Sequence, residues 1–401
     1  MRKNNLLLII IPFIILISAT FKSYGQTQYQ LKGKINGVAS GTISISIIDE
    51  NNRPIKTIDS GEIVNYLFDL NGTIESPQMV DVKIMPGNWR FRVLVENSKI
   101  TIDADTTGAA HHDMTKYGGD KFTDITNFKV TGSRNFDDWM SYQNDPQQKQ
   151  FDQDELGIEK QFKAAQGNDS AMNKVMERAG LISGVFRNWQ KTYIYNYVNQ
   201  HPSHVAGVYM LYDFYTWLPD ERMTVLNAIL PKFTGEATTT KYYAVLADVS
   251  AKINAVQPGK PAPDFTLLKR DSTSFNLAAF AKGKYTMIDF WASWCGPCRQ
   301  MIPYWKTVYK RYRDKGFQIV SISADSKYKD WVKCLDVEKM SWAQVIDDYN
   351  TKSRLSRTMD LYQIPHIPYY LLLDKNGKIL ASTSDGNIIN NELKIIYEEH
   401  L

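Results

Sequence analysis

One short motif limits what this chain can fold into: two cysteines, Cys295 and Cys298, separated only by Gly296 and Pro297. The apolar, β-favouring residues 285–288 come before the motif and predict a buried strand. After it, apolar and aromatic residues recur at helical spacing and predict one buried helix face: Ile302, Trp305, Tyr309 and Tyr312. The two cysteines are therefore expected where a strand turns into a helix.

This position suits the two sulfurs to redox chemistry. Cys295 is expected at the helix N-terminus, where unpaired backbone N–H groups and the positive end of the helix dipole favour a thiolate over a thiol. Cys298 follows one turn later, close enough to close a small disulfide ring. The pair is thus predicted to be a dithiol that can be oxidised and reduced repeatedly.

Length and composition indicate an ordinary multidomain globular protein. At 401 residues the chain is too long for one compact core, and roughly two to three domains are expected. Hydrophobic residues make up 43% and charged residues 22%, as in typical folded proteins. The formal net charge of +4 is small for this length and gives no reason to expect nucleic acid as a partner.

The N-terminal segment has the pattern of a secretory signal peptide, which we assign to residues 1–25. Arg2 and Lys3 precede an apolar run at 6–17, and small residues follow. The alternative is an uncleaved membrane anchor, although spanning helices usually need about 20 apolar residues. Because no cysteine lies near the cleavage region, a lipid-modified N-terminus is excluded. We expect an exported protein, membrane-associated only if this segment is uncleaved.

In an exported protein, the number of cysteines indicates whether disulfides stabilise the fold. The chain has 3 cysteines, and the third is Cys334. A disulfide framework in an oxidising compartment would use more cysteines at wider spacing. The Cys295/Cys298 pair is therefore predicted to be reactive. Cys334 shares a helical face with Trp331 and Leu335 and is predicted to be a buried, inert thiol.

Residues 26–130 have the pattern of β structure. Short runs alternate polar and apolar residues, with Ile43, Ile45 and Ile47 on one face, and turn residues separate the runs. This spacing predicts a small antiparallel β-sandwich. Residues 131–256 then become helical and polar, which predicts a helical connector or domain.

Aromatic residues recur in this helical part: Phe186, Trp189, Tyr193 and Tyr197, and a cluster at 212–217. They indicate either a peptide-binding surface or packing between helices, and we favour packing, since stripes at this spacing usually form core.

A stiff Pro- and Gly-rich stretch at 257–263 marks the start of the last domain, residues 257–401. Strands are predicted at 285–290, 317–323 and 369–373, with a helical insert from Trp331 onward to Ile346 and helices on both faces. The expected fold class is a multidomain α+β protein.

The sequence from Trp294 to Cys298, following a strand, resembles the active site of the thioredoxin superfamily. The stretch from Gly259 to Leu267 and the insert after Asp325 resemble its exported TlpA/ResA-type branch. This resemblance covers about 258–401 and implies an α/β thioredoxin fold there. The β-rich and helical parts resemble, less specifically, domains that precede such modules in exported proteins of some Gram-negative bacteria, which implies a periplasmic location.

The resemblance also implies roles for individual residues. Cys295 matches the attacking cysteine, Cys298 the resolving cysteine, and Asp289 the buried acid that moves protons to and from the resolving thiol. Pro368 matches the cis-proline that faces the disulfide, where the backbone of Ile367 can pair with a substrate strand. The implied substrate contacts are Trp294, Gly296, Pro297, Ile367 and Pro368.

One position departs from the branch's pattern. A glutamate often stands three residues after the second cysteine, and here that position is Met301. Any proton-relay role of that glutamate is therefore absent, or is taken by Asp289. Pro303 matches the proline that kinks the redox helix.

Two alternatives concern the site itself. Cys334 and His366 could nominally complete a zinc site with the cysteine pair, but zinc ligands usually come in close pairs, so no metal is expected. Asp289 lies in an otherwise apolar strand, where burial should raise its pKa and suit it to proton exchange at neutral pH. The alternative is a structural aspartate.

Two other functions remain open. One is a substrate-binding or assembly protein on a thioredoxin scaffold, against which the intact cysteine pair argues. The other is a peroxiredoxin-like peroxidase, which needs a threonine where this chain has Ala292.

The predicted reaction is thiol–disulfide exchange with disulfide-bonded protein substrates, without a cofactor. Because Gly296-Pro297 is the thioredoxin dipeptide and adds no histidine to stabilise the thiolate, we expect a reductant. An exported reductant implies a membrane-embedded electron donor. A homodimer through the N-terminal or helical part is a further expectation.

Overall fold

The computed structural model describes residues 28–49, 53–115, 120–215, 221–348 and 356–398. The predicted signal segment at 1–25 and Trp217 of the aromatic cluster lie outside these residues. The chain groups into two compact units, residues 1–137 and 138–401. The finer division at 25/26, 130/131 and 256/257 stays a prediction. In the described part of the chain, no helix is both long and apolar enough to cross a membrane.

The first unit is a sheet of ten strands in the order β10-β7-β1-β4-β3-β2-β5-β6-β9-β8. The strands are β1 (Tyr29–Asn36), β2 (Ser40–Ile48), β3 (Pro54–Val64), β4 (Leu67–Gly72), β5 (Gln78–Met85), β6 (Trp89–Val95), β7 (Lys99–Asp105), β8 (Ala110–Asp113), β9 (Lys121–Asp124) and β10 (Asn127–Thr131). The pairs β1·β7 and β6·β9 are parallel and the rest antiparallel. The predicted β domain is confirmed, but the purely antiparallel pairing is wrong for those two pairs.

This sheet curls around an apolar core. Phe91 of β6 and Phe128 of β10 come from strands near opposite ends of the order, yet their rings are 4.9 Å apart. Ile43 and Ile45 are fully buried as expected. Ile47 is only half-buried and Ile48 is buried instead, because the register with β3 shifts between Ile45 and Ser46. A shift of one residue moves the following side chains to the other face of a strand.

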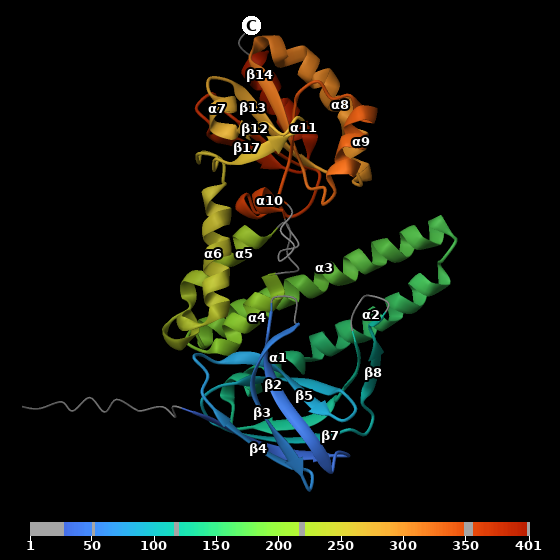
Figure 1. Cartoon of the computed structure of the whole chain (residues 1–401), viewed down its shortest axis with the longest axis vertical. Helices are drawn as coiled ribbons and strands as arrows, with labels where there is room; N and C mark the ends of the chain where they lie inside the picture. The colour runs from blue at the N-terminus through green and yellow to red at the C-terminus, as the bar shows by residue number, and fades with distance from the viewer. Residues whose placement is uncertain (1–27, 50–52, 116–119, 216–220, 349–355, 399–401) are drawn as a thin grey trace, which may run out of the picture. The chain divides into compact units, whose positions relative to one another are not determined.

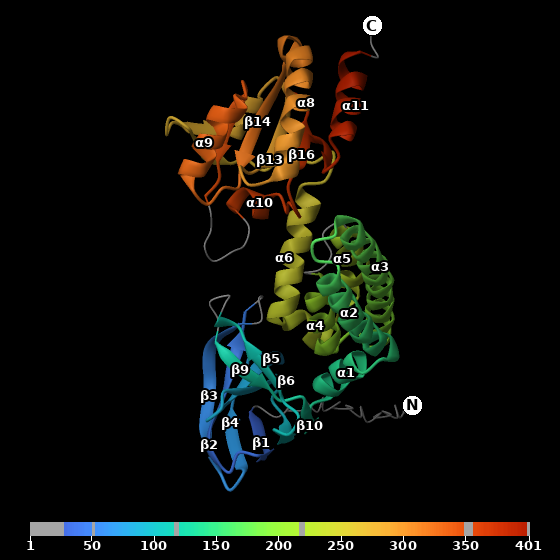
Figure 2. The same ribbon diagram turned by 90° about the vertical axis from the view of Figure 1, so that its right-hand side faces the viewer.

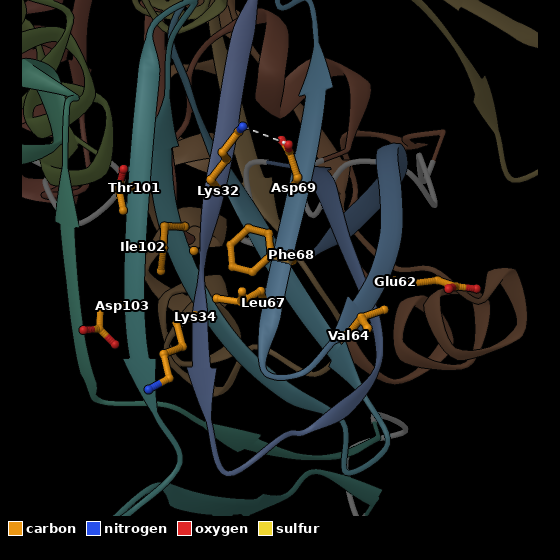
Figure 3. A pocket seen from close by; sticks show the side chains of 11 residues that line it. Lys32, Lys34, Glu62, Val64, Leu67, Phe68, Asp69, Thr101, Ile102 and Asp103 are labelled. Carbon is orange, nitrogen blue, oxygen red and sulfur yellow. Dashed lines mark ion pairs between the residues drawn. The ribbon is translucent and has the colours of Figure 1, made fainter.

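A hollow of about 790 Å³ lies on this unit over β7, β1, β4 and β3 (Figure 3). Phe68 lies across Gly33, its register partner on β1, where a Cβ atom would come within 2.8 Å of the ring. Lys32 and Asp69 form an ion pair of 3.0 Å at its edge. The other charged residues that line it are Lys34, Glu62 and Asp103.

The second unit begins with helices. These are α1 (Arg134–Gln143, which starts in the first unit), α2 (Pro146–Ala164), α3 (Asp169–Gln200), α4 (Val205–Tyr215), α5 (Arg222–Ile229) and α6 (Lys241–Ala255), with short 3-10 helices at Leu230–Lys232 and Gly235–Thr239. Helix α3 is 32 residues long and runs beside α2 (Figure 1).

The aromatic stripe of α3 packs against neighbouring helices. Trp189 stacks on Tyr142 of α1 at 5.5 Å, and Phe186 stacks on Phe151 of α2 at 3.7 Å. The hydroxyl of Tyr197 donates to Asp138 at 2.7 Å. These contacts agree with the packing interpretation.

The rest of the second unit is a seven-stranded mixed sheet in the order β12-β11-β15-β14-β13-β16-β17. Its elements are β11 (Thr266–Lys269), β12 (Ser274–Asn276), α7 (Leu277–Ala281), β13 (Tyr285–Trp291), α8 (Gly296–Tyr312), a 3-10 helix (Arg313–Lys315), β14 (Phe317–Ser323), α9 (Tyr328–Glu338), β15 (Ala343–Ile346), α10 (Arg357–Leu361), β16 (Tyr369–Leu373), β17 (Ile379–Thr383) and α11 (Gly386–Tyr397).

Helices cover both faces of this sheet, as expected, with α8 and α11 on the same face (Figure 2). On that face Trp305 of α8 and Leu393 of α11 pack with Met287. Leu277 of α7 and Met359 of α10 pack with Ile288 on the other. The predicted helix from Trp331 to Ile346 is wrong in its second half. Helix α9 ends at Glu338 and residues 343–346 form strand β15, which pairs in parallel with β14.

Candidate active site

The cysteine pair lies where central strand β13 meets helix α8. Strand β13 pairs with β14 and β16, so all seven of its residues lie inside the sheet. Cys295 is the N-cap of α8, and its Sγ accepts a hydrogen bond from the backbone N–H of Cys298 at 3.2 Å. Cys295 and Cys298 form a disulfide, with their Cα atoms 5.3 Å apart. The predicted strand–turn–helix position and the small ring are both present.

The disulfide is recessed and its surroundings are exposed. Cys295 is 5% exposed and Cys298 4%, whereas Trp294 is 67% exposed. Gly296 and Pro297 are exposed as well. A partner must therefore contact this rim to reach the sulfurs.

The loop before β16 meets the disulfide from another part of the chain. The Ile367–Pro368 peptide bond is cis, in agreement with the resemblance. Ile367 packs against the apolar cluster that contains both cysteines. The fold therefore brings Ile367 to the cysteine pair, and Pro368 with it. Whether these residues bind substrate stays a prediction.

Asp289 lies within β13 and is buried, with 6% of its surface exposed. Side chains alternate along a strand, so Asp289 shares a face with Met287 and Trp291, which pack under α8. Its pKa is raised to about 7, because burial penalises the carboxylate more than the hydrogen bond from Ser321 favours it. In the described part of the chain no hydrogen bond joins Asp289 to either cysteine.

Two residues beyond those predicted from the sequence set the surroundings of Asp289. Ser321 Oγ donates to Asp289 Oδ2 at 2.6 Å, and Trp342 Nε1 donates to Ser321 Oγ at 2.8 Å. All three side chains are buried. Ser321 is a polar residue flanked by Val320 and Ile322 in the buried strand β14, and that signal could have identified it.

A second buried carboxylate, Asp325, holds the turn that leads into the motif. It accepts hydrogen bonds from the backbone N–H of Ser293 at 2.9 Å and from Ser293 Oγ at 2.6 Å. Ser323 Oγ donates to the same carboxylate at 2.6 Å. Asp325 therefore fixes the segment just before Trp294 and Cys295. In the sequence, Asp325 marks only the start of the insert and gives no signal of this role.

The remaining candidates near the motif are apolar or separate. Met301 packs in the apolar cluster of Trp305 and offers no group that carries a proton. Pro303 lies inside α8. Cys334 is buried beside the cysteine pair, and burial raises the pKa of its thiol, as expected for an inert cysteine. His366 is exposed. Among the described residues no three His, Cys, Asp or Glu side chains gather as metal ligands would.

Residues 257–397 match the family model described as Redoxin. A thiol-disulfide oxidoreductase ResA of Bacillus cereus is 30% identical over 155 residues, which are 38% of this chain and 82% of that protein. The chain belongs to the ResA family of thiol-disulfide oxidoreductases.

Further relatives are similar over the same part of the chain. ResA of Geobacillus thermodenitrificans is 28% identical over 34% of this chain and 75% of its own length. The solved thioredoxin domain of a thiol-disulfide oxidoreductase from Bacteroides vulgatus is 31% identical, with a TM-score of 0.31, over 35% of this chain and 97% of that one. The protein is a thioredoxin-superfamily enzyme with thiol-disulfide oxidoreductase activity. Residues 29–139 match the model "Domain of unknown function (DUF4369)".

Proposed function

We propose that this enzyme is exported and reduces disulfide bonds in proteins through Cys295 and Cys298. The observation that supports this best is the recessed disulfide at the start of α8, bordered by exposed Trp294. Such a site is open to a flexible polypeptide that contacts the rim.

In the proposed reaction the Cys295 thiolate attacks one sulfur of the substrate disulfide. A mixed disulfide forms and the other substrate sulfur leaves as a thiolate. Cys298 then loses its proton and attacks Cys295 Sγ, which closes the disulfide and releases the second substrate sulfur. Two electrons pass to the substrate. Asp289 is assigned the Cys298 proton, because a carboxyl with a pKa of about 7 can exchange a proton at neutral pH.

Location and partners belong to the same proposal. The signal-like segment at 1–25 supports export, with the periplasm as the compartment. A reductant there needs electrons from across the membrane, so we propose that a membrane-embedded donor supplies them.

We also propose that two copies of the chain pair through the β or helical part, and sedimentation of the full chain tests this. Recovery of the chain from cell fractions tests export, and a cytoplasmic chain that keeps residues 1–25 would contradict it.

Reduction of insulin, driven by dithiothreitol, tests the reaction. The wild type should accelerate insulin precipitation and Cys295→Ser should not, whereas Cys334→Ala, which removes the third cysteine, should keep the rate. Equal rates for wild type and Cys295→Ser would reject the enzyme in favour of a binding scaffold. A Cys295 that peroxide oxidises much faster than an ordinary thiol would favour the peroxidase instead.

A further inference from the structure

A small pocket in the second unit joins the helical part to the loop beside the redox site. Its volume is about 260 Å³. Arg222 of α5 and Gln257, just after α6, line one side. Gln363, Pro365, Tyr369 and Ser382 from the thioredoxin part line the other. The pocket therefore has one cationic side chain among neutral polar and apolar ones.

The guanidinium of Arg222 has an unsatisfied donor among the residues that the structure describes. Its Nε is buried and has no hydrogen-bond acceptor in the described part of the chain. The neighbouring carboxylate of Glu221 is bound to Lys191 at 3.0 Å instead. Burial lowers the pKa of Arg222, opposed only by the Tyr215 side chain, whose ring is 6.0 Å from the guanidinium carbon. Arg222 is half-buried, and a partly desolvated cation is stabilised by a counter-charge, so this site favours an anion.

The shape of the Arg222 guanidinium and the nearby hydroxyl groups indicate which kind of anion the pocket binds. A guanidinium offers planar, paired donors that match a carboxylate. Ser382 Oγ donates to the hydroxyl of Tyr369 at 3.3 Å, so the phenol proton can be given to a ligand. A carboxylate in the pocket would thus meet a charged donor and a neutral donor.

Both walls of the pocket are anchored. Lys252 of α6 pairs with Asp360 of α10 at 2.9 Å, and Val256 packs in the core of the thioredoxin part. Asn227 of α5 and Asn254 of α6 exchange side-chain amide hydrogen bonds of 3.2 and 3.0 Å. Arg222 is therefore positioned by contacts that continue into the redox domain.

The pocket adjoins the loop that meets the disulfide. Pro365 and Tyr369 line the pocket and lie on either side of Ile367 and Pro368 in the sequence. Ile367 packs against the cluster of Cys295 and Cys298. A polypeptide that lies along this loop can therefore reach both the sulfurs and Arg222.

We propose that this pocket binds a carboxylate of the substrate polypeptide through Arg222, so that the enzyme prefers disulfides with an acidic group nearby. This inference rests on the proposed function and adds a substrate class to it. The carboxylate comes from an Asp or Glu side chain or from the chain's C-terminus.

Short peptides test this preference. Each has one cysteine in a mixed disulfide with mercaptoethanol and one Asp, which is moved along the peptide, with an Asn peptide as its match. Free and amidated C-termini separate the two sources of the carboxylate. At the best position the wild-type chain should reduce the Asp peptide, or the free-acid peptide, with a kcat/KM about 10-fold above its match, the value of one charge-assisted hydrogen bond.

Arg222→Gln should abolish this ratio while neutral peptides are still reduced, and Arg222→Lys should keep part of it. Arg187→Gln is the matched control, since Arg187 is exposed on α3 and the change in charge is the same. Equal kcat/KM for acidic and neutral peptides in the wild type, or an unchanged ratio in Arg222→Gln, would overturn the inference. If no peptide is reduced at all, the proposed function itself fails.

A binding measurement keeps the two failures apart. The Nε–H resonance of Arg222 should shift when the wild type is titrated with the acidic peptide carrying serine in place of cysteine. It should not shift with the neutral match. This readout needs neither turnover nor a variant chain, and no shift with any acidic peptide would contradict the pocket's role even if the enzyme reduces disulfides.

Discussion

Ser321 Oγ and Asp289 Oδ2 are 2.6 Å apart on adjacent parallel strands, where the two residues are direct register partners. The serine donates this bond and accepts one from Trp342 Nε1 at 2.8 Å. The hydrogen-bond partner of this buried carboxyl is thus a neutral group. Burial raises the pKa of Asp289, and the hydrogen bond from this serine lowers it.

Titration of Asp289 is the first prediction. Its carboxyl carbon, followed by NMR in the oxidised chain, should titrate with a pKa of about 7. Ser321→Ala should raise this pKa further, because the serine's hydrogen bond favours the carboxylate. A wild-type value near the ordinary aspartate value of about 4 would contradict the proton role.

Stability should depend on pH through the same group. A raised pKa means that between pH 3.8 and about 7 the folded chain holds this proton more tightly than the unfolded chain. Its contribution to the free energy of unfolding is therefore complete below that window and is lost as the pH rises through about 7.

Asp289→Asn cannot lose the proton. In urea unfolding, its stability relative to wild type should rise by on the order of 4 kcal/mol between acid and alkaline pH, since the pKa of Asp289 is raised from 3.8 to about 7. Ser321→Ala, which keeps the carboxyl and raises its pKa, should keep the loss of stability with rising pH and extend it to higher pH. A difference between Asp289→Asn and wild type that does not change with pH would show that Asp289 has no raised pKa.

The local sequence pattern predicted several strands correctly but could not predict where helix α9 ends. The mostly apolar run at 317–323 and the apolar run at 369–373 are strands with the predicted bounds, since short segments rich in apolar and β-branched residues are typical of buried strands. The helix predicted to Ile346 was wrong. Lys339 ends α9 in the left-handed region with a φ of 47°, and a lysine gives no such signal in a sequence.

In the candidate site, too, the sequence predicted some residues and missed others. The positions of Cys295 and Cys298 and the burial of Asp289 were expected from their neighbours in the sequence. Ser321 and Asp325 were missed because each acts on a residue 32 positions away, across strand pairings that local pattern cannot define. Contacts between residues that are distant in the sequence depend on strand register, and only the folded structure shows that register.

Trp294→Ala is predicted to impair substrate use without harming the fold. The side chain is 67% exposed, so the free energy of unfolding should change by less than about 0.5 kcal/mol. The kcat/KM for insulin should fall several-fold, mainly through KM. Trp331→Ala is the contrast, since this buried ring packs with the cysteine cluster and its loss should cost about 3–5 kcal/mol. A Trp294→Ala enzyme with wild-type KM would remove Trp294 from the substrate contacts.

The reduction potential decides the direction of electron flow. Equilibrated with a dithiothreitol buffer, the Cys295/Cys298 pair should have a potential near that of thioredoxin, about −270 mV. The reason is the Gly296-Pro297 dipeptide, which adds no charged group next to the thiolate. A potential near about −120 mV would make the enzyme an oxidant.

Trapping of the reaction intermediate tests the central claim most directly. Reduced Cys298→Ser, which lacks the resolving thiol, is mixed with oxidised insulin, and the product is mapped by mass spectrometry. The account predicts a stable mixed disulfide between Cys295 and an insulin chain, absent from Cys295→Ser. No adduct, or an adduct on Cys334 alone, would contradict it.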